Sequence, residues 1–213
     1  MWHVWAVVVA GGSGRRFGAE KQFALLGDRP VVEWAVSACR PCASGVVLVV
    51  PPGTTAEVDY GADVVVEGGA TRTASVRRGL SAVPDEADVI LVHDAARPLA
   101  APALFRSVID AVISGGADGA IPALPVSDTI KVVDGTRTVT ATLDRATLVA
   151  VQTPQAFGAA LLRRAHAAGA EATDDAALVE ALGATVRVVP GDPRNLKITT
   201  PADLGTAEHL LRG

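Results

Sequence analysis

The sequence opens with a glycine-rich stretch whose residues suit the binding of phosphate groups. From Ala10 it runs Ala-Gly-Gly-Ser-Gly-Arg-Arg-Phe-Gly, and Lys21 follows three residues after the last of these glycines. Closely spaced glycines let the backbone approach a ligand and turn several N–H groups towards an anion. Arg16 and Lys21 add positive charge beside that cradle. The stretch therefore predicts a loop that holds the triphosphate of a nucleotide.

Two other interpretations of this loop remain open from its pattern alone. The spacing Gly12-x-Gly14-x-x-x-Gly18 is a loose form of the dinucleotide fingerprint, which would indicate an NAD-dependent oxidoreductase. Such a fold usually carries an acid at the end of its second strand, whereas the apolar run here ends in Pro51-Pro52-Gly53. The glycines could instead only close a turn between a strand and a helix, although such a turn has no use for three nearby cations.

A carboxylate follows an apolar run in a second group of residues, Leu-Val-His-Asp-Ala-Ala-Arg-Pro, which begins at Leu91. A carboxylate at a strand end can hold Mg²⁺, and Mg²⁺ that bridges phosphate oxygens offsets the charge developed in phosphoryl transfer. Asp94 is therefore the candidate metal ligand. It could instead cap the next helix. His93 has no histidine or carboxylate dyad partner in the sequence pattern, so we expect a structural role for it.

Further hydroxyls and cations recur through the second half of the chain. They include Thr129, Arg145, Thr153, the run Thr173-Asp174-Asp175 and the run from Asn195 to Thr199 that contains Lys197. Taken singly these are ordinary loop residues, and some of the threonines could cap helices.

The elements that must position these residues alternate between strands and helices. Valine-rich runs predict buried strands, and segments of helical period follow them. The predicted strands are Val4–Ala10, Val46–Val50, Asp63–Val66 and Val89–Val92. The predicted helices are Pro30–Cys39, Thr73–Ala82, Pro102–Ser114, Ala159–Ala168, Asp175–Leu182 and Pro201–Leu211. This alternation indicates a doubly wound, mostly parallel, Rossmann-like α/β sheet, whose ligands bind beyond the carboxyl ends of the strands.

One segment breaks the alternation and predicts a projecting arm. Residues 129–143 are rich in β-branched side chains on both sides of Asp134-Gly135, which is a hairpin signal. A two-stranded hairpin is marginally stable alone in water, so we expect this arm, at about residues 126–145, to pack against a second copy of the chain. The rest of the sequence gives no sign of a linker, and we expect one domain over residues 1–213.

Composition limits the partners that this chain can have. The 213 residues are 49% hydrophobic and carry a formal net charge of −4 with no blocks of like charge, so neither nucleic acid nor an anionic membrane is an expected partner. The apolar N-terminus lacks a basic flank and is too short to span a bilayer, which favours a cytoplasmic protein. Cys39 and Cys42 form one CxxC pair, which we interpret as neither a redox nor a zinc motif.

The order of these motifs resembles one family over nearly the whole chain. The glycine-rich opening with Arg16 and Lys21, the strand-end motif around Asp94, the Thr153-Pro154-Gln155 turn and the Asn195–Thr199 segment are similar to the methylerythritol phosphate cytidylyltransferases of the non-mevalonate isoprenoid pathway. The resemblance implies transfer of CMP from CTP to 2-C-methyl-D-erythritol 4-phosphate, with release of pyrophosphate and formation of 4-diphosphocytidyl-2-C-methyl-D-erythritol. It also implies Mg²⁺ and a homodimer whose arm helps to build the partner's substrate site.

The resemblance also assigns roles to individual residues. Arg16, Lys21 and Lys197 match catalytic cations, and the nucleotide contacts match Ala10, Gly11, Gly12, Gly69, Ser75, Asp94 and Ala95. The acceptor contacts match Asp94, Thr129, Arg145, Thr153 and Lys197, of which Thr129 and Arg145 reach the substrate across the dimer. One departure is Ala70, which stands where one branch of the family has an acid.

Two alternatives stay within reach of the sequence. The acceptor could be another polyol phosphate such as ribitol 5-phosphate, because acceptor choice depends on a few hydroxyl contacts. The chain could also be a nucleotide-binding module without catalysis, although Arg16, Lys21, Asp94 and Lys197 together argue for an enzyme. A phosphate monoester is already anionic near neutral pH, so in-line attack on the α-phosphorus of CTP requires positioning and charge neutralisation rather than a strong base.

Overall fold

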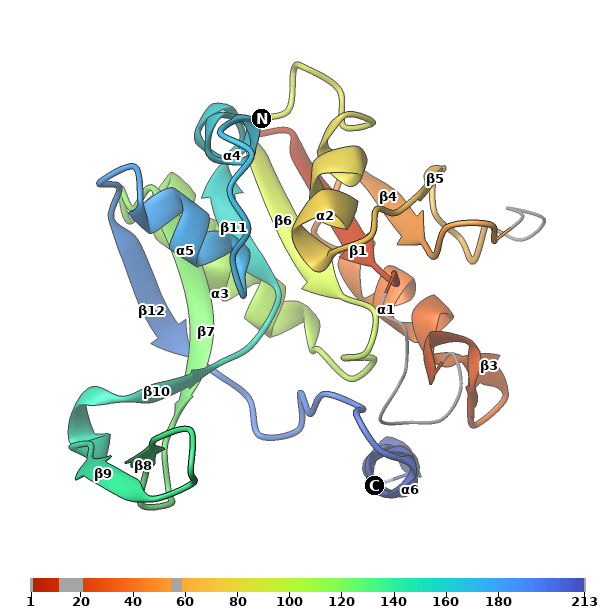
Figure 1. Cartoon of the computed structure of the whole chain (residues 1–213). Helices are drawn as coiled ribbons and strands as arrows, with labels where there is room; N and C mark the ends of the chain where they lie inside the picture. Colours follow the sequence, from red (N-terminus) through yellow and green to blue (C-terminus); the bar gives the residue numbers. More distant parts are fainter. Residues whose placement is uncertain (1, 12–20, 55–58, 213) are drawn as a thin grey trace.

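A single mixed sheet forms the centre of the protein. The computed structural model describes residues 2–11, 21–54 and 59–212, and within these ranges eight strands join one sheet in the order β10-β7-β11-β6-β1-β4-β5, with β12 on the other side of β7 (Figure 1). The strands are β1 (Val4–Val9), β4 (Gly45–Val50), β5 (Val64–Glu67), β6 (Val89–Asp94), β7 (Gly119–Pro125), β10 (Val149–Val151), β11 (Gln155–Gly158) and β12 (Val186–Pro190).

One half of the sheet is parallel and was predicted from the sequence. β6, β1, β4 and β5 lie side by side, and each neighbouring pair is parallel. All six residues of β4 and all six of β6 are buried, because helices cover both faces of the sheet. Valine-rich runs suit such doubly covered strands. The four strands expected from apolar runs are confirmed, with ends shifted by one or two residues.

The other half contains antiparallel pairs that sequence patterns did not predict. β11 runs antiparallel to β6 and β7, β10 runs antiparallel to β7, and only β12 is parallel to β7. β10 and β11 follow one another along the same side of β7, separated by residues 152–154. β7 contains Pro122 and ends at Pro125, and proline inside a run argues against an interior strand. That is why the pattern missed it.

Helices cover the sheet in two layers. They are α1 (Val31–Cys39), α2 (Arg72–Leu80), α3 (Pro102–Ile113), α4 (Ala159–Ala167), α5 (Asp175–Glu180) and α6 (Pro201–Arg212). The side chains of α1 and α3 join one apolar core on one face, and those of α2, α4 and α5 join a second core on the other face (Figure 1). The doubly wound α/β prediction is therefore confirmed. In the described part of the chain no helix is both long and apolar enough to cross a bilayer.

The last helix, α6, lies beyond the carboxyl ends of the parallel strands (Figure 1). It packs beside a small hairpin of β2 (Leu25–Leu26) and β3 (Arg29–Pro30), which adjoins a short helical turn, η1 (Lys21–Phe23). Its start is capped: Pro201 is the first helical residue, and the Asp203 carboxylate accepts hydrogen bonds from the N–H groups of Thr199 and Thr200. This cap fixes where the chain enters α6.

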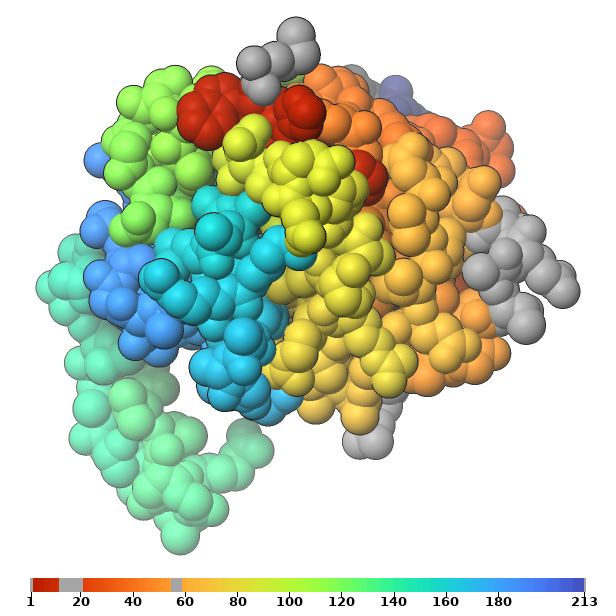
Figure 2. Space-filling model, turned by 90° about the horizontal axis from the view of Figure 1, so that it is seen from above, coloured from red at the N-terminus to blue at the C-terminus, as the bar shows by residue number. Residues whose placement is uncertain are grey.

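The expected arm is present as a separate two-stranded sheet. β8 (Lys131–Val133) and β9 (Val139–Thr142) pair only with each other in the described structure, and they project from the body (Figures 1 and 2). The connecting turn is longer than the expected two residues at Asp134-Gly135, because the Asp134 side chain accepts hydrogen bonds from the N–H groups of Thr136 and Thr138. Every residue of both strands is exposed. A short helical turn, η2 (Arg145–Thr147), joins the arm to β10.

Two glycines in helices should respond oppositely to alanine. A Cβ on Gly79 of α2 would lie 2.5 Å from Val7 Cγ1 and 2.8 Å from Val49 Cγ2, because α2 packs closely against the sheet. A Cβ on Gly205 of α6 would meet nothing within 4 Å. We expect Gly79→Ala to lower the free energy of unfolding by about 1–3 kcal/mol through overpacking. Gly205→Ala should raise it by about 0.5–1 kcal/mol through helix propensity. Urea unfolding measures the unfolding free energy of both variants. Changes of the same sign in the two variants would contradict this packing.

Candidate active site

A partly buried ion pair lies at the carboxyl end of β6. Asp94, the last residue of that strand, has a side chain that is 11% exposed, and its Oδ2 accepts a hydrogen bond from Lys197 Nζ at 2.6 Å. The two residues are 103 positions apart in the sequence. Asp94 was also considered as a helix cap, but the next helix, α3, begins at Pro102 and Ala101 is its cap. The carboxylate therefore points at cations rather than at a helix start.

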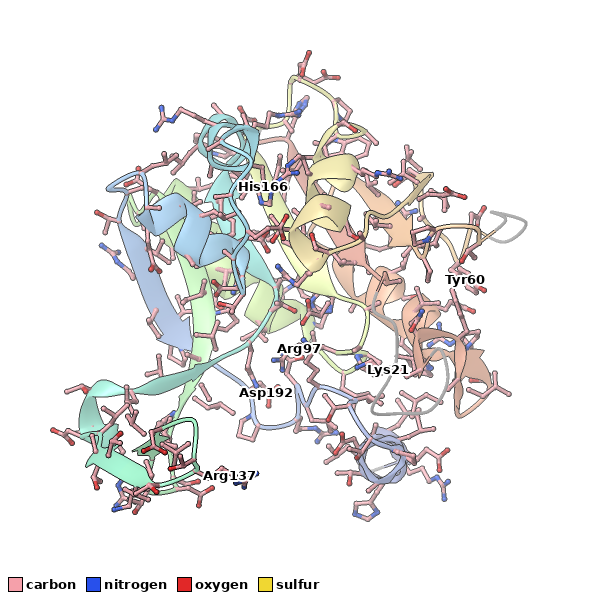
Figure 3. All side chains as sticks on the ribbon, in the orientation of Figure 1. Lys21, Tyr60, Arg97, Arg137, His166 and Asp192 are labelled. Carbon is pink, nitrogen blue, oxygen red and sulfur yellow. The ribbon has the colours of Figure 1, made fainter. Side chains whose placement is uncertain are left out.

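The position of Lys197 is fixed by backbone hydrogen bonds on both sides of it. The Arg97 guanidinium donates through Nη1 to the Asn195 carbonyl at 2.8 Å, and the Ile198 N–H donates to the Ala96 carbonyl at 2.8 Å. Ile198 is fully buried in the core that α6 covers. The C-terminal segment is thus fastened to the loop after β6, and this places Lys197 over Asp94. Figure 3 shows Arg97 and Lys21 on this side of the sheet.

A second cation, Arg72, approaches Asp94 from the start of α2. Its Nε and Nη2 each lie 3.4 Å from Asp94 Oδ1, and its Nη1 lies 2.7 Å from Asp175 Oδ2. Thr71 caps α2 by accepting a hydrogen bond from the Ala74 N–H, which sets the position of Arg72 in the first turn. Arg72 is missing from the residues predicted for the site, because the sequence pattern predicts that this helix begins at Thr73. A cation in the first turn next to a capping threonine was the available signal.

These cations control the charge of Asp94. Burial alone would raise the pKa of this carboxyl, but Lys197 and then Arg72 and Arg97 offset the burial and hold the pKa well below its ordinary value. Asp94 is therefore ionised throughout the neutral range. The same attraction raises the pKa of Arg72 against the effect of its own burial, with Asp175 and Asp94 as the causes. The site is a preformed arrangement of one anion and its surrounding cations.

A chain of hydrogen bonds orients the hydroxyl of Thr153 beside Asp94. The Asp94 N–H donates to Thr153 Oγ1 at 2.9 Å, and Thr153 Oγ1 lies 3.0 Å from His93 Nδ1. His93 Nε2 lies 3.1 Å from the Arg97 carbonyl, which can only accept, so Nε2 carries the proton and Nδ1 accepts from Thr153. One lone pair of the Thr153 hydroxyl remains for a ligand. His93 thus holds Thr153 in place, in keeping with its expected structural role.

The glycines expected near the nucleotide bring two loops together around Ser75. A Cβ on Gly11 would lie 3.0 Å from Ser75 Oγ, and a Cβ on Gly69 would lie 2.5 Å from the Ala74 Cβ. Ser75 donates to the Thr71 carbonyl at 2.8 Å and accepts from the Gly69 N–H at 3.1 Å. The loops after β1 and after β5 therefore both lie close against the first turns of α2, and at Gly69 the space is too small for a Cβ.

The remaining expected nucleotide contacts fall partly within this region. The Ala10 N–H donates to the Val49 carbonyl at 2.8 Å, and the Ala95 N–H donates to the Val9 carbonyl at 3.0 Å, so both residues continue the strand ends. Both are buried. Lys21 begins η1 and is partly buried. Gly12 and Arg16 lie outside the residues that the structure describes.

Thr129 and Arg145 belong to the arm rather than to the cluster around Asp94. Both are exposed, and Arg145 Nη1 donates to the Ser127 carbonyl at 2.5 Å across the base of the arm. A cavity of about 640 Å³ lies beside this base, between β7, β12 and the segment from Arg145 to Val149. The structure therefore gathers Asp94, Thr153 and Lys197 and leaves Thr129 and Arg145 on the projecting arm.

The residues around Asp94 fit a magnesium ion held mainly by its substrate. Among the described residues no group of three or more His, Cys, Asp or Glu side chains could enclose a metal ion. Mg²⁺ in nucleotide enzymes is commonly held by one or two carboxylates together with substrate phosphates and water. A single ionised carboxylate at a strand end matches that donor set.

The cysteine pair takes no part in this site. Cys39 is fully buried in α1, where its Sγ donates to the Ala35 carbonyl at 3.3 Å, and Cys42 is partly buried, with no disulfide between them. Burial raises the pKa of the Cys39 thiol, and it also raises that of Cys42. Thiols in this state are poor nucleophiles and poor metal ligands.

The chain is similar to one family over almost all of its length. The family model described as IspD, 2-C-methyl-D-erythritol 4-phosphate cytidylyltransferase, matches residues 4–213. A protein of that name from Nocardia farcinica is 49% identical over 217 residues, which cover 97% of this chain and 93% of the relative. The crystal structure of the cytidylyltransferase from Thermus thermophilus matches with a TM-score of 0.83 at 40% identity, covering 97% of this chain and 98% of the other.

Some relatives carry a second enzyme name. The bifunctional enzyme IspD/IspF from Solidesulfovibrio magneticus is 45% identical over 225 residues, which cover 95% of this chain. The chain spans 56% of the length of that relative.

The burial of His93 should give the protein a distinctive acid sensitivity. Burial lowers the pKa of His93 from its ordinary 6.5 to about 4, whereas Asp94 opposes this effect. The unfolded chain therefore binds one more proton than the folded chain between these values, and stability falls as pH falls from 6.5 to 4, by up to about 1.4 kcal/mol per pH unit. We expect His93→Gln to reduce the slope of the unfolding free energy against pH by the amount that one bound proton contributes, about 1.4 kcal/mol per pH unit at most. Urea unfolding at several pH values, with a chelator present, measures this slope. Identical slopes in the two proteins would contradict a neutral, buried His93.

Proposed function

We infer the reaction from one premise: this chain belongs to the 2-C-methyl-D-erythritol 4-phosphate cytidylyltransferase family. The protein is a cytidylyltransferase, a member of the nucleotidyltransferases. It transfers CMP from CTP to 2-C-methyl-D-erythritol 4-phosphate in isoprenoid precursor biosynthesis and releases pyrophosphate. The observation that best supports this reaction is the hydrogen bond of 2.6 Å between Lys197 Nζ and Asp94 Oδ2. It brings the motif around Asp94 and the C-terminal motif around Lys197 together at the carboxyl end of β6.

The residues around that pair suit an in-line displacement at phosphorus. An oxygen of the methylerythritol phosphate attacks the α-phosphorus of CTP, a new P–O bond forms, and the bond to the bridging oxygen of the β-phosphate breaks. Pyrophosphate leaves with the electrons of that bond. The attacking phosphate is already an anion near neutral pH, so the residues need not remove a proton from it. Catalysis then comes from orientation and from neutralising charge.

Cations from two parts of the chain, one near its start and one near its end, would neutralise that charge. Lys197 lies at the end of β6 with a side chain that is 40% exposed, so its ammonium group can move from Asp94 to a substrate phosphate. Lys21 of η1 and Arg16, which lies between β1 and η1 in the sequence, would hold the β- and γ-phosphates. Ala10, Gly11, Gly12, Gly69, Ser75 and Ala95 would meet the nucleotide, largely through backbone groups. Because Ala70 has no acidic side chain, a contact there would also be made by the backbone.

Asp94 would serve both the acceptor and a divalent cation. Its low pKa keeps the carboxylate ionised, so it can accept a hydroxyl hydrogen bond from the acceptor or ligate a metal ion. Asp94 would help to hold Mg²⁺, which would reduce the phosphate charge that opposes attack. The free lone pair of Thr153 would accept from a hydroxyl of the polyol, because both of its other hydrogen-bonding positions are used.

We also propose that the protein acts as a cytoplasmic homodimer of one-domain subunits. The arm supports the dimer, because its strands expose Val132, Val133 and Val139 to solvent. A lone hairpin with exposed valines gains stability by packing on another surface. In this arrangement Thr129 and Arg145 of one subunit would contact the acceptor phosphate bound by the other subunit.

The reaction is tested directly by pyrophosphate release. Purified protein with CTP and Mg²⁺ should release pyrophosphate when methylerythritol phosphate is added, and release without an acceptor should be negligible. Lys197→Met should lower kcat by about 100-fold or more, because it removes one preorganised transition-state donor. Release with ribitol 5-phosphate in place of methylerythritol phosphate would keep the mechanism and change the acceptor. A folded protein that releases none with either acceptor would indicate a binding module.

Sharing of the site between subunits is tested by mixing two inactive variants. Lys197→Met disables the subunit that holds CTP, and Arg145→Met disables the arm that reaches its partner. Equal mixing after subunit exchange should yield about half heterodimers, each with one intact site, so about a quarter of wild-type activity should return. The matched control mixes Lys197→Met with Asp94→Asn, which act in the same subunit and should restore nothing. Recovery in both mixtures, or in neither, would contradict an arm that acts across the dimer.

A further inference from the structure

A buried carboxylate lies behind the candidate active site and takes no part in the proposed reaction. Asp175, the first residue of α5, is 1% exposed, and its Oδ1 lies 3.0 Å from Nε2 of His166 on α4, which is also 1% exposed. The carboxylate can only accept, so His166 Nε2 carries a proton and donates it. Figure 3 shows His166 on α4. A buried carboxylate without partners is costly, so the side chains around this one have to satisfy it.

The other oxygen of Asp175 is satisfied from the active site. Arg72 Nη1 lies 2.7 Å from Asp175 Oδ2, and the Arg72 side chain is 26% exposed. On its other edges the same guanidinium faces Asp94 Oδ1, at 3.4 Å from both Nε and Nη2. Arg72 is therefore shared unequally between two carboxylates. The closer one is Asp175.

The loop before α5 is also fastened to the start of α2 and to β11. Thr73 Oγ1 donates to the Ala172 carbonyl at 3.2 Å, and the Gln155 amide donates to the Asp174 carboxylate at 3.1 Å. Asp174 in turn caps α5 by accepting from the Ala177 N–H at 3.1 Å. These bonds hold Asp175 at a fixed distance from the first turn of α2. The pair of Asp175 and His166 is thus a buried, hydrogen-bonded anchor.

We propose that Asp175, held by His166, is a positioning residue that restrains Arg72 from closing fully on Asp94, so that the Asp94 carboxylate stays available to a divalent cation. This proposal rests on the proposed role of Asp94 in binding the metal ion. A guanidinium prefers a two-pronged contact with one carboxylate, at N···O distances near 2.7–2.9 Å. Asp175 provides the short contact and leaves the long, weaker pair for Asp94. Arg72 then offsets part of the negative charge of Asp94 without blocking the carboxylate oxygens that would bind the metal ion.

Removing the anchor should therefore weaken metal binding. In Asp175→Asn the carboxylate is replaced by a neutral group of the same shape, and Arg72 is free to pair with both oxygens of Asp94. We expect the Mg²⁺ concentration for half-maximal activity to rise by about 10-fold to 100-fold, the usual effect of losing a partner of a metal ligand. Mn²⁺ titration followed by electron paramagnetic resonance, with CTP present and no acceptor, should show the same rise without turnover.

A second substitution separates positioning from structural support. Arg72→Gln removes the competing cation, so Asp175→Asn should have no further effect on Mn²⁺ affinity in that background. The matched control is Asp63→Asn, which removes a carboxylate that pairs with Arg40 at 2.6 Å beside β5 and should leave Mn²⁺ affinity unchanged. If Asp175→Asn does not fold, His166→Gln tests the same anchor, and we expect a smaller rise in the same direction.

The outcomes distinguish this inference from the proposed function. Wild-type protein that binds no Mn²⁺ in the presence of CTP would overturn the metal role of Asp94 and the inference with it. Wild-type protein that binds Mn²⁺ with an affinity unchanged in folded Asp175→Asn would overturn the inference alone. A shift of equal size in the Arg72→Gln background would also overturn it, because Asp175 would then act without Arg72.

Discussion

The site depends on one constraint: Asp94 must stay ionised although its side chain is largely removed from water. A carboxylate that is largely removed from water persists as an anion only where cations and hydrogen-bond donors compensate for lost hydration. Lys197 and Arg72 supply that compensation from distant parts of the chain. Each must be held where it stands, so the capped start of α2 and the fastened C-terminal segment both serve the same carboxylate. The fold around β6 therefore keeps the Asp94 carboxyl group ionised.

This arrangement explains what antiparallel strands contribute to a largely parallel sheet. β11 lies beside β6, and the turn before it, which contains Thr153, therefore reaches the carboxyl end of β6. A strand parallel to β6 would have its amino end, and the turn before it, at the amino end of β6, on the far side of the sheet from Asp94. The antiparallel neighbour instead returns a turn to the site, and that turn supplies the hydroxyl that Asp94 and His93 hold in place.

Sequence patterns predicted the parallel half of the sheet better than the rest. Long valine-rich runs and helix caps act locally, so β4, β6 and α6 followed from neighbouring residues alone. β7 did not, because two prolines hide a strand whose partners lie far along the chain. Arg72 and His166 were not singled out, and Asp175 was named only within a run of loop residues and as the start of a predicted helix, because none of the three has a distinctive local pattern until folding brings α2, α4 and α5 together over the sheet.

The distribution of charge, more than its total, fits the site to anionic substrates. The chain as a whole carries a formal net charge of −4, yet the region around the end of β6 collects Lys197, Arg72 and Arg97. Fixed cations in a partly dry region attract phosphate groups more strongly than the same charges spread over the surface, because water screens them less. Asp94 prevents these cations from repelling one another before substrate arrives. In the proposed reaction, bound phosphates would give Lys197 a second anion to pair with, and the Asp94 carboxylate would then be available to a metal ion or to a hydroxyl.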